Sequence, residues 1–147
     1  MTDYVFDAEP LIAYFYDEPG ADDVRERLDA IEAEEATGAL AQVTAAEVAY
    51  KIARLEAGDP NQIAPSEDDL DVGKRDVRVL QGFGVTVETS LWQLAARIKA
   101  PGGISLGDAY AVALAAAEDA TLILGADPEF DDLPVDVDIH RIRDEPG

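Results

Sequence analysis

Residues 105–130 read SLGDAYAVALAAAEDATLILGADPEF, an alanine-rich helical pattern followed by a short apolar run. The helical pattern begins with Asp108, and the apolar run TLIL (residues 121–124) is soon followed by Asp127. A short apolar run bounded by turn residues predicts a buried strand. Both segments are therefore typical of a protein core, yet each has a carboxylate at one end.

Ordinary structural roles can explain these two acids one at a time. Ser105-x-x-Asp108 is a helix-start signature, in which the serine caps the helix and the acid bonds back to it. Asp127-Pro128 is a common opening of a turn. A functional interpretation needs further acids at equivalent places in the fold.

Short apolar runs and segments of helical periodicity alternate along the whole chain. Strands are predicted at residues 3–6 (DYVF), 39–44 (ALAQVT), 85–88 (VTVE), 121–124 (TLIL) and near 137–142 (VDIHRI). Helices are predicted from Pro10, through 24–31 with Gly38 ending that segment, over 44–58, and from Ser66, Ser90 and Ser105. This alternation predicts an α/β fold of three layers, with a mostly parallel central sheet and helices on both faces.

Composition excludes several classes of protein. The 147 residues are 48% hydrophobic, so we expect one folded domain spanning residues 1–147. No apolar run approaches the roughly 20 residues of a membrane helix, and the N-terminus lacks a basic signal-peptide start, which predicts a cytoplasmic protein. With no cysteine and a single histidine, His140, the chain has no zinc–thiolate site and little scope for a serine–histidine triad.

The net charge is strongly negative. The chain has 32 acidic and 11 basic residues, a net charge of −21, and its lysines are Lys51, Lys74 and Lys99. A dispersed acidic surface poor in lysine indicates adaptation to a high-salt cytoplasm, where the screening length is only about 3 Å at 1 M salt. In dilute buffer the same surface repels nucleic acid. The usual inference that an acidic protein is not a nucleic-acid enzyme is therefore weakened here, but it is not removed.

Four carboxylates come from segments that should converge at one edge of the predicted sheet. Asp7 follows the first strand, and Asp127 follows TLIL. Glu47 lies in the first turn of the helix after the second strand, as Thr44-x-x-Glu47, and Asp108 lies in the first turn of its own helix. In α/β sheets, sites gather beyond the carboxyl ends of the strands.

Several carboxylates in one cleft repel one another unless cations neutralise them. Oxygen ligands alone select the hard ions Mg²⁺ or Mn²⁺. Such ions bind substrate phosphates and activate water for attack on phosphorus, which predicts a metal-dependent phosphodiesterase or nuclease. Lys51 and Arg54, four and seven residues after Glu47 on the same helical stripe, are candidates for binding a backbone phosphate. The alternative is that both are solvated charges beside the core face.

Three stretches resemble the PIN-domain ribonucleases, in particular the VapC-type toxins of toxin–antitoxin pairs. They are YVFDAEPLIAYFYDEPGA (4–21), VTAAEVAYKIAR (43–54) and AARIKAPGGISLGDAYAVALAAAEDATLILGADPEFDDL (95–133). Carried over residue by residue, the acidic constellation of the family falls on Asp7, Glu47, Asp108 and Asp127. The resemblance implies Mg²⁺- or Mn²⁺-dependent endoribonuclease activity, a homodimer, and inhibition by a small cognate antitoxin.

The first acidic motif departs from the family pattern. The family usually has a small hydroxyl residue or asparagine after its first aspartate, whereas Ala8 and Glu9 follow Asp7 here. The departure either removes a hydrogen bond near the metal site or adds Glu9 as a further acid. Glu129 and Asp131, which flank the last motif, are interpreted as bystanders on an acidic surface.

Three alternatives remain open. The chain also resembles haloacid-dehalogenase-like phosphatases, in which Asp7 would attack phosphorus covalently, although Glu47 and Asp108 then have no role. The motifs behind this alternative are Asp7-x-Glu9, Thr44 and Asp127-x-x-x-Asp131. A non-catalytic PIN-like binding module is the second, but four acids without a metal would only destabilise it. A PIN-type RNA-processing nuclease outside a toxin system is the third.

Overall fold

The computed structural model describes residues 1–58, 64–89 and 91–145. Within these ranges five strands form one sheet of order β3-β2-β1-β4-β5, and every neighbouring pair is parallel. The strands are β1 (Tyr4–Phe6), β2 (Gly38–Ala41), β3 (Thr86–Glu88), β4 (Thr121–Leu124) and β5 (Asp138–Arg141). The predicted parallel sheet is confirmed.

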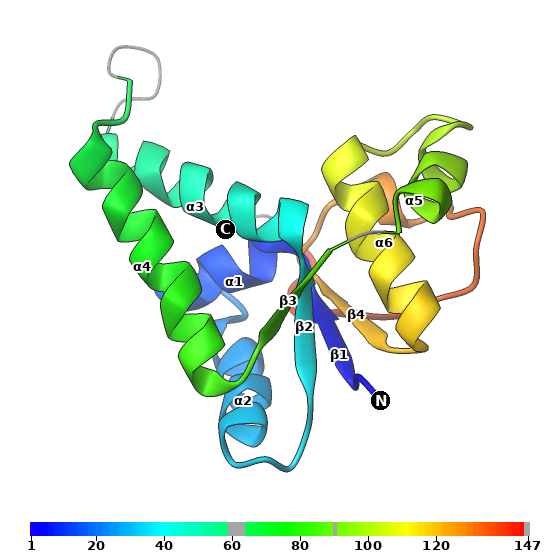
Figure 1. The fold of residues 1–147 in the computed structure, drawn as a ribbon, viewed down its shortest axis with the longest axis horizontal. Helices are drawn as coiled ribbons and strands as arrows, with labels where there is room; N and C mark the ends of the chain where they lie inside the picture. Colours follow the sequence, from blue (N-terminus) through cyan, green and yellow to red (C-terminus); the bar gives the residue numbers. More distant parts are fainter. Residues whose placement is uncertain (59–63, 90, 146–147) are drawn as a thin grey trace.

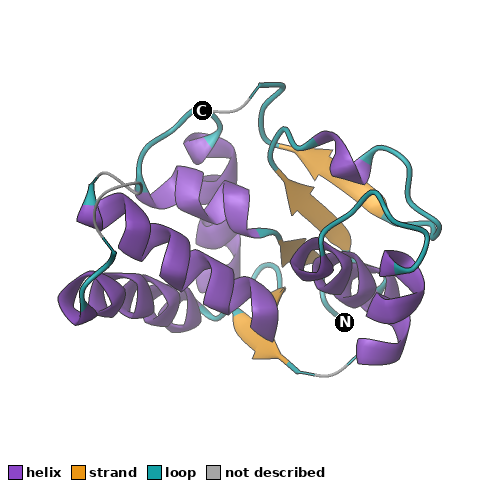
Figure 2. Ribbon diagram, turned by 90° about the horizontal axis from the view of Figure 1, so that it is seen from above, coloured by secondary structure: helices purple, strands orange, loops and turns teal. Residues whose placement is uncertain are grey.

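Helices cover both faces of the sheet. They are α1 (Ala8–Phe15), α2 (Ala21–Glu32), α3 (Gln42–Ala57), α4 (Glu67–Phe83), α5 (Trp92–Lys99) and α6 (Leu106–Glu118), with a short 3₁₀ helix, η1 (Pro128–Phe130). Helices α1 to α4 lie on one side of the strands and α5 and α6 on the other (Figure 1). The view from above shows the same separation (Figure 2). The three predicted layers are therefore present.

Alternate residues of the three central strands, β1, β2 and β4, pack into two different cores. Val5 of β1 belongs to the core under α5 and α6, whereas Phe6 belongs to the core under α1 to α4. In β4, Leu122 and Leu124 join the first core and Ile123 joins the second. Successive side chains of a strand point to opposite faces, so an uninterrupted apolar run is what a sheet covered on both faces requires.

The boundary between β2 and α3 differs from the prediction. Strand β2 ends at Ala41, and residues 42–44, predicted as strand, form the first turn of α3. Thr44, Val48 and Ile52 are buried at helical spacing, and the packing of this stripe overrides the strand preference of the β-branched residues. Glu47 consequently lies in the second turn of α3, not the first.

Other predicted boundaries shift by smaller amounts. Gly38 does not end a helix: α2 stops at Glu32, and Gly38 opens β2, where a Cβ would lie 2.5 Å from Ile31 Cδ1. Helix α1 begins at Ala8, and Pro10 occupies its first turn, where proline is tolerated. The predicted helix start at Ser90 lies outside the described residues. Among the described helices, none is long and apolar enough to cross a membrane.

Candidate metal centre

The sheet order brings three of the predicted acids to one edge. Strand β1 lies between β2 and β4, so the carboxyl ends of these three strands are neighbours. Asp7 directly follows β1, and its backbone N–H donates to the Ile123 carbonyl of β4 at 3.0 Å. Asp127 is three residues beyond β4, and Glu47 lies in α3, which follows β2 without a loop. Asp108 comes from the first turn of α6, on the other side of the sheet.

Asp7 is a buried carboxylate whose hydrogen bonding is incomplete. It stands at the N-terminal cap of α1, yet its side chain makes no capping bond. The residue is 5% exposed, and its Oδ1 has no hydrogen-bond partner among the described residues. Burial raises the pKa of Asp7 to about 7, and the nearby Glu47 carboxylate contributes to the rise. A buried oxygen without a partner is costly, so this atom suits a cation ligand.

Glu47 reaches from α3 to the start of α6. Its Oε1 is also buried without a partner in the described part of the chain, while its Oε2 lies 3.4 Å from Lys51 Nζ. A Cβ on Gly107 would lie only 2.0 Å from Glu47 Oε1, so the missing side chain at residue 107 makes room for the carboxylate. Glu47 therefore lies beside Asp108, the next residue of α6, and its charge helps to raise the pKa of Asp108.

Asp108, Asp127 and Glu129 form the tightest group of acids. Each offers a carboxylate oxygen, and these oxygens lie within 4.8 Å of one another. The pKa of Asp108 is raised to about 9, first by burial, then by a hydrogen bond with Glu129 and by the charge of Asp7. The same hydrogen bond lowers the pKa of Glu129. Carboxylates this close either share a proton or bind a cation.

The structure places Glu129 inside the group, contrary to its interpretation as a bystander. It lies in η1, the turn capped by Asp127, whose side chain accepts from the Glu129 backbone N–H at 2.9 Å. Asp131 instead pairs with Arg141 at 2.8 Å, with a largely exposed side chain. The two residues differ because η1 turns one carboxylate toward Asp108 and the other toward β5.

The helix-start interpretation of Asp108 accounts for its backbone but not its carboxylate. The Ser105 hydroxyl accepts from the Asp108 backbone N–H at 3.2 Å, which is one of the two bonds of a capping box. At the start of α4, Ser66 and Asp69 form both bonds, at 3.1 and 2.9 Å. The carboxylate of Asp108 is therefore not used by the helix backbone and is available to the acid group.

The two basic candidates occupy different surroundings. Lys51 is ion-paired with Glu47, and although burial opposes it, the Glu47 charge leaves the pKa of Lys51 raised. Arg54 lies one turn further along α3, where its guanidinium is 4.7 Å from the ring centroid of Tyr50. The structure thus brings Lys51 to the acids, while Arg54 covers an aromatic ring.

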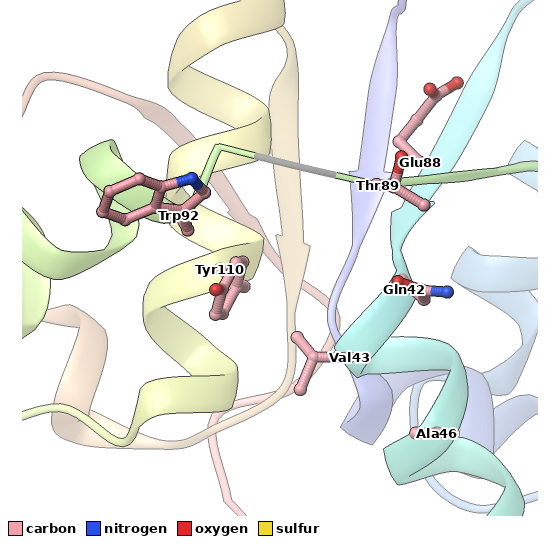
Figure 3. A pocket seen from close by; sticks show the side chains of 7 residues that line it. All are labelled: Gln42, Val43, Ala46, Glu88, Thr89, Trp92 and Tyr110. Atoms are coloured by element: carbon pink, nitrogen blue, oxygen red, sulfur yellow. The ribbon is translucent and has the colours of Figure 1, made fainter.

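A groove of about 640 Å³ lies between α3 and the α5–α6 pair. Trp92 and Tyr110 line it from α5 and α6, opposite Ala46 of α3 (Figure 3). Ala46 directly precedes Glu47, and Tyr110 follows Asp108 by two residues, so the groove and the acids share the same helices. Trp92 is 64% exposed. Exposed aromatic rings are surfaces on which nucleic-acid bases stack.

Comparison with known protein families identifies the class to which this fold and acidic edge correspond. The profile of the PIN domain matches residues 4–136, and the chain belongs to the PIN-domain family. The resemblance seen in the acidic motifs is thereby confirmed. The match also favours the PIN interpretation of Asp7 over that of a phosphatase nucleophile.

Two solved structures share the fold over nearly the whole chain. VapBC from Salmonella typhimurium bound to DNA aligns with a TM-score of 0.62 and 16% identity, over 97% of this chain and 99% of that one. VapBC2 from Rickettsia felis, bound to a DNA fragment from their promoter, aligns with a TM-score of 0.63 and 15% identity, over 95% and 98%. Identities this low establish similarity of fold. A comparison with curated proteins gave no significant sequence match.

Proposed function

We propose that this PIN domain is a metal-dependent endoribonuclease, and that it acts as the VapC-like toxin of a toxin–antitoxin pair. Two observations together carry the proposal: Asp7 Oδ1 and Glu47 Oε1 are buried without a partner among the described residues, and the charges of these two acids act on Asp108 of the Asp108–Asp127–Glu129 group. Donors that are all oxygen fit Mg²⁺ or Mn²⁺. The proposed ligands are Asp7, Glu47, Asp108 and Asp127, with Glu129 as a fifth acid.

Some side chains would bind the metal ion, and others would bind and orient the RNA substrate. When bound, the ion neutralises charge on the scissile phosphate and activates water for in-line attack. Asp7 and Glu47 supply buried oxygens that no other group satisfies among the described residues. Lys51 forms an ion pair with Glu47 on its more exposed side, and its positive charge could also bind a backbone phosphate. Trp92 and Tyr110 offer stacking surfaces for unpaired bases, which favours a single-stranded RNA substrate.

The proposed partners follow from the fold likeness to toxin–antitoxin complexes. We expect a small cognate antitoxin, a homodimer and a cytoplasmic site of action. An RNA-processing nuclease outside a toxin system would have the same acidic site. A neighbouring small reading frame that encodes a DNA-binding protein would distinguish the toxin from the housekeeping enzyme.

Cleavage of a single-stranded RNA in Mn²⁺ or Mg²⁺, compared with EDTA, tests the enzymatic proposal. Asp7→Asn and Asp108→Asn should abolish metal-dependent cleavage, because each removes a ligand charge. Their melting temperatures without metal should be unchanged or higher, because each replaces a carboxyl group whose ionisation is opposed by burial and by the neighbouring acids. Asp69→Asn, in the capping box of α4, is the matched control: its amide oxygen can still accept from Ser66, so it should lose about 0.3–1 kcal/mol, the contribution of a negative charge at a helix N-terminus, and keep cleavage.

Two results would contradict the proposal. Cleavage retained by Asp7→Asn would show that Asp7 is not a metal ligand. Calorimetry that detects no Mn²⁺ binding to the folded protein would instead favour a non-catalytic binding module.

A further inference from the structure

Glu9, which departs from the family pattern, joins the two segments that carry Asp7 and Asp127. It is the second residue of α1, the helix that begins directly after Asp7. Its Oε2 accepts from the Ala126 backbone N–H at 2.8 Å and from Arg143 Nε at 3.1 Å. Ala126 directly precedes Asp127 in the loop after β4. One carboxylate thus connects the start of α1 to the loop that carries the last acid.

The loop is shaped to receive this carboxylate. A Cβ on Gly125 would lie 1.5 Å from Glu9 Oε2, so a side chain at residue 125 is incompatible with the observed position of Glu9. The carbonyl oxygen of Gly125 accepts a hydrogen bond from the Arg141 guanidinium at 2.8 Å. The backbone just before Asp127 is therefore held by α1 through Glu9 and by β5 through Arg141.

Arg143 holds Glu9 in place. The arginine side chain is 8% exposed, and its NH2 group lies 3.1 Å from Glu9 Oε2, in addition to the bond from Nε. Its NH1 group donates to Glu18 at 3.0 Å and to the Pro19 carbonyl at 3.2 Å, both in the segment between α1 and α2. Hydrogen bonds between charged groups are about twice as strong as neutral ones, and shielding from water reduces their screening.

We propose that Glu9, fixed by Arg143, is a positioning residue that sets the place of Asp127 relative to Asp7. This inference rests on the proposed metal-dependent function. The carboxylates of Asp127, Asp108 and Glu129 lie close together and oppose one another's ionisation before a cation binds, so a loop that is free to relax would carry Asp127 away. The hydrogen bond from Ala126 to Glu9 opposes that movement and keeps Asp127 in the position required for metal binding. Groups that orient metal ligands typically contribute 10–100-fold to metal affinity or activity.

Calorimetric titration of the full chain with Mn²⁺ tests the inference without relying on cleavage. Glu9→Ala should lower Mn²⁺ affinity by about 10–100-fold. Glu9→Gln keeps an oxygen acceptor for Ala126 but loses the charge that faces Arg143, so its affinity should be intermediate. Circular dichroism on the same samples reports whether each variant is folded, and the near-isosteric Glu9→Gln decides the question if Glu9→Ala unfolds.

Glu18→Ala is the matched control. It removes a carboxylate that binds the same arginine, but one whose bond does not reach the loop of Asp127. It should lower stability while leaving Mn²⁺ affinity close to that of the unmodified protein. Equal losses of affinity in Glu18→Ala and Glu9→Ala, or unchanged affinity in both Glu9 variants, would overturn the positioning role. Unchanged affinity in Asp7→Asn would instead overturn the metal site itself, so the two failures are distinguishable.

Discussion

Glu47 Oε1 and a Cβ on Gly107 would compete for the same space between α3 and α6. The added carbon would lie 2.0 Å from Oε1 and 2.9 Å from the carboxylate carbon. The atoms in conflict are the far end of a flexible side chain, whereas residue 107 is fixed in the first turn of a buried helix. A side chain at residue 107 would therefore displace Glu47 and leave α6 in place.

Gly107→Ala should separate metal binding from stability. Alanine is favoured over glycine within helices by roughly 0.5–1 kcal/mol, which offsets the cost of moving the Glu47 carboxylate. We expect an unchanged or higher melting temperature without metal, together with weaker Mn²⁺ binding and slower RNA cleavage. Calorimetric titration and thermal unfolding of one preparation measure both effects.

Gly82→Ala is the control for this substitution. Gly82 is also helical, in α4, and a Cβ there would meet nothing within 4 Å. It should gain a similar amount of helix stability and bind Mn²⁺ like the unmodified protein. Full Mn²⁺ affinity in Gly107→Ala would show that the observed position of Glu47 is not needed for metal binding.

Glu129→Gln and Asp131→Asn form a second matched pair. The glutamine removes one charge from the group formed with Asp108 and Asp127, while its amide can still hydrogen-bond to Asp108. Mn²⁺ affinity should fall, and metal-free stability should not. Asp131→Asn removes an acid from the same segment that pairs outward with Arg141, so cleavage and Mn²⁺ affinity should persist. The reverse order of effects would restore the bystander interpretation of Glu129.

The positions of Asp7, Glu47 and Asp127 near one edge of the sheet could be predicted from strand order and direction, whereas Asp108 lies at the start of α6, which no strand directly precedes. An acid that directly follows a buried apolar run, such as Asp7, must lie at the carboxyl edge of a parallel sheet. Glu129 was not predictable in this way. It lies two residues beyond Asp127, and its direction depends on how η1 turns over Phe130, a buried residue of the core under α5 and α6.

The sequence around Glu9 gave even less indication of its role. Its partners Ala126 and Arg143 are 117 and 134 residues away along the chain, so its bonds exist only once the sheet has formed. The family pattern showed that residue 9 is unusual, and nothing near it indicated an arginine partner. The β2–α3 boundary escaped prediction for a related reason, since the buried stripe that begins at Thr44 decides it through tertiary packing.

The stability of the metal-free protein should fall as pH rises through the neutral range. Asp7 and Asp108 have pKa values raised from 3.8 to about 7 and about 9, chiefly by burial. Above about pH 4 the folded state therefore binds more protons than the unfolded state, and stability decreases with pH until the folded groups ionise. Between about pH 6 and pH 9 ordinary carboxylates are ionised in both states, so within this range Asp7 and Asp108 are distinguished from the other carboxylates.

Urea unfolding in EDTA across that pH range measures the slope. Asp7→Asn should make the slope shallower up to about pH 7, whereas Asp108→Asn should make it shallower up to about pH 9. The acid Asp69, exposed at the start of α4, provides a comparison, and Asp69→Asn should leave the slope intact. A metal-free stability that rises from pH 6 to pH 9 would contradict the burial of both carboxylates.

Rising salt should preserve or improve both folding and cleavage. Ordinary nucleic-acid enzymes lose affinity as salt rises, because phosphate contacts release counterions. This chain carries a net charge of −21, so its long-range field repels RNA, and attraction is confined to the proposed ions and Lys51. Screening at about 1 M salt shortens the range of the repulsion to about 3 Å and also relieves repulsion within the fold.

The decisive measurement is metal-dependent cleavage of a single-stranded RNA across a KCl series, with circular dichroism on the same samples. Lys51→Met is the internal comparison: it should slow cleavage at every salt concentration while the upward or flat trend with KCl remains. If the protein stays folded but cleavage falls steeply from low salt upward, the acidic surface does not govern the encounter with RNA. Counterion release from many phosphate contacts would then have to dominate, and these contacts would have to come from the 11 lysines and arginines of the chain.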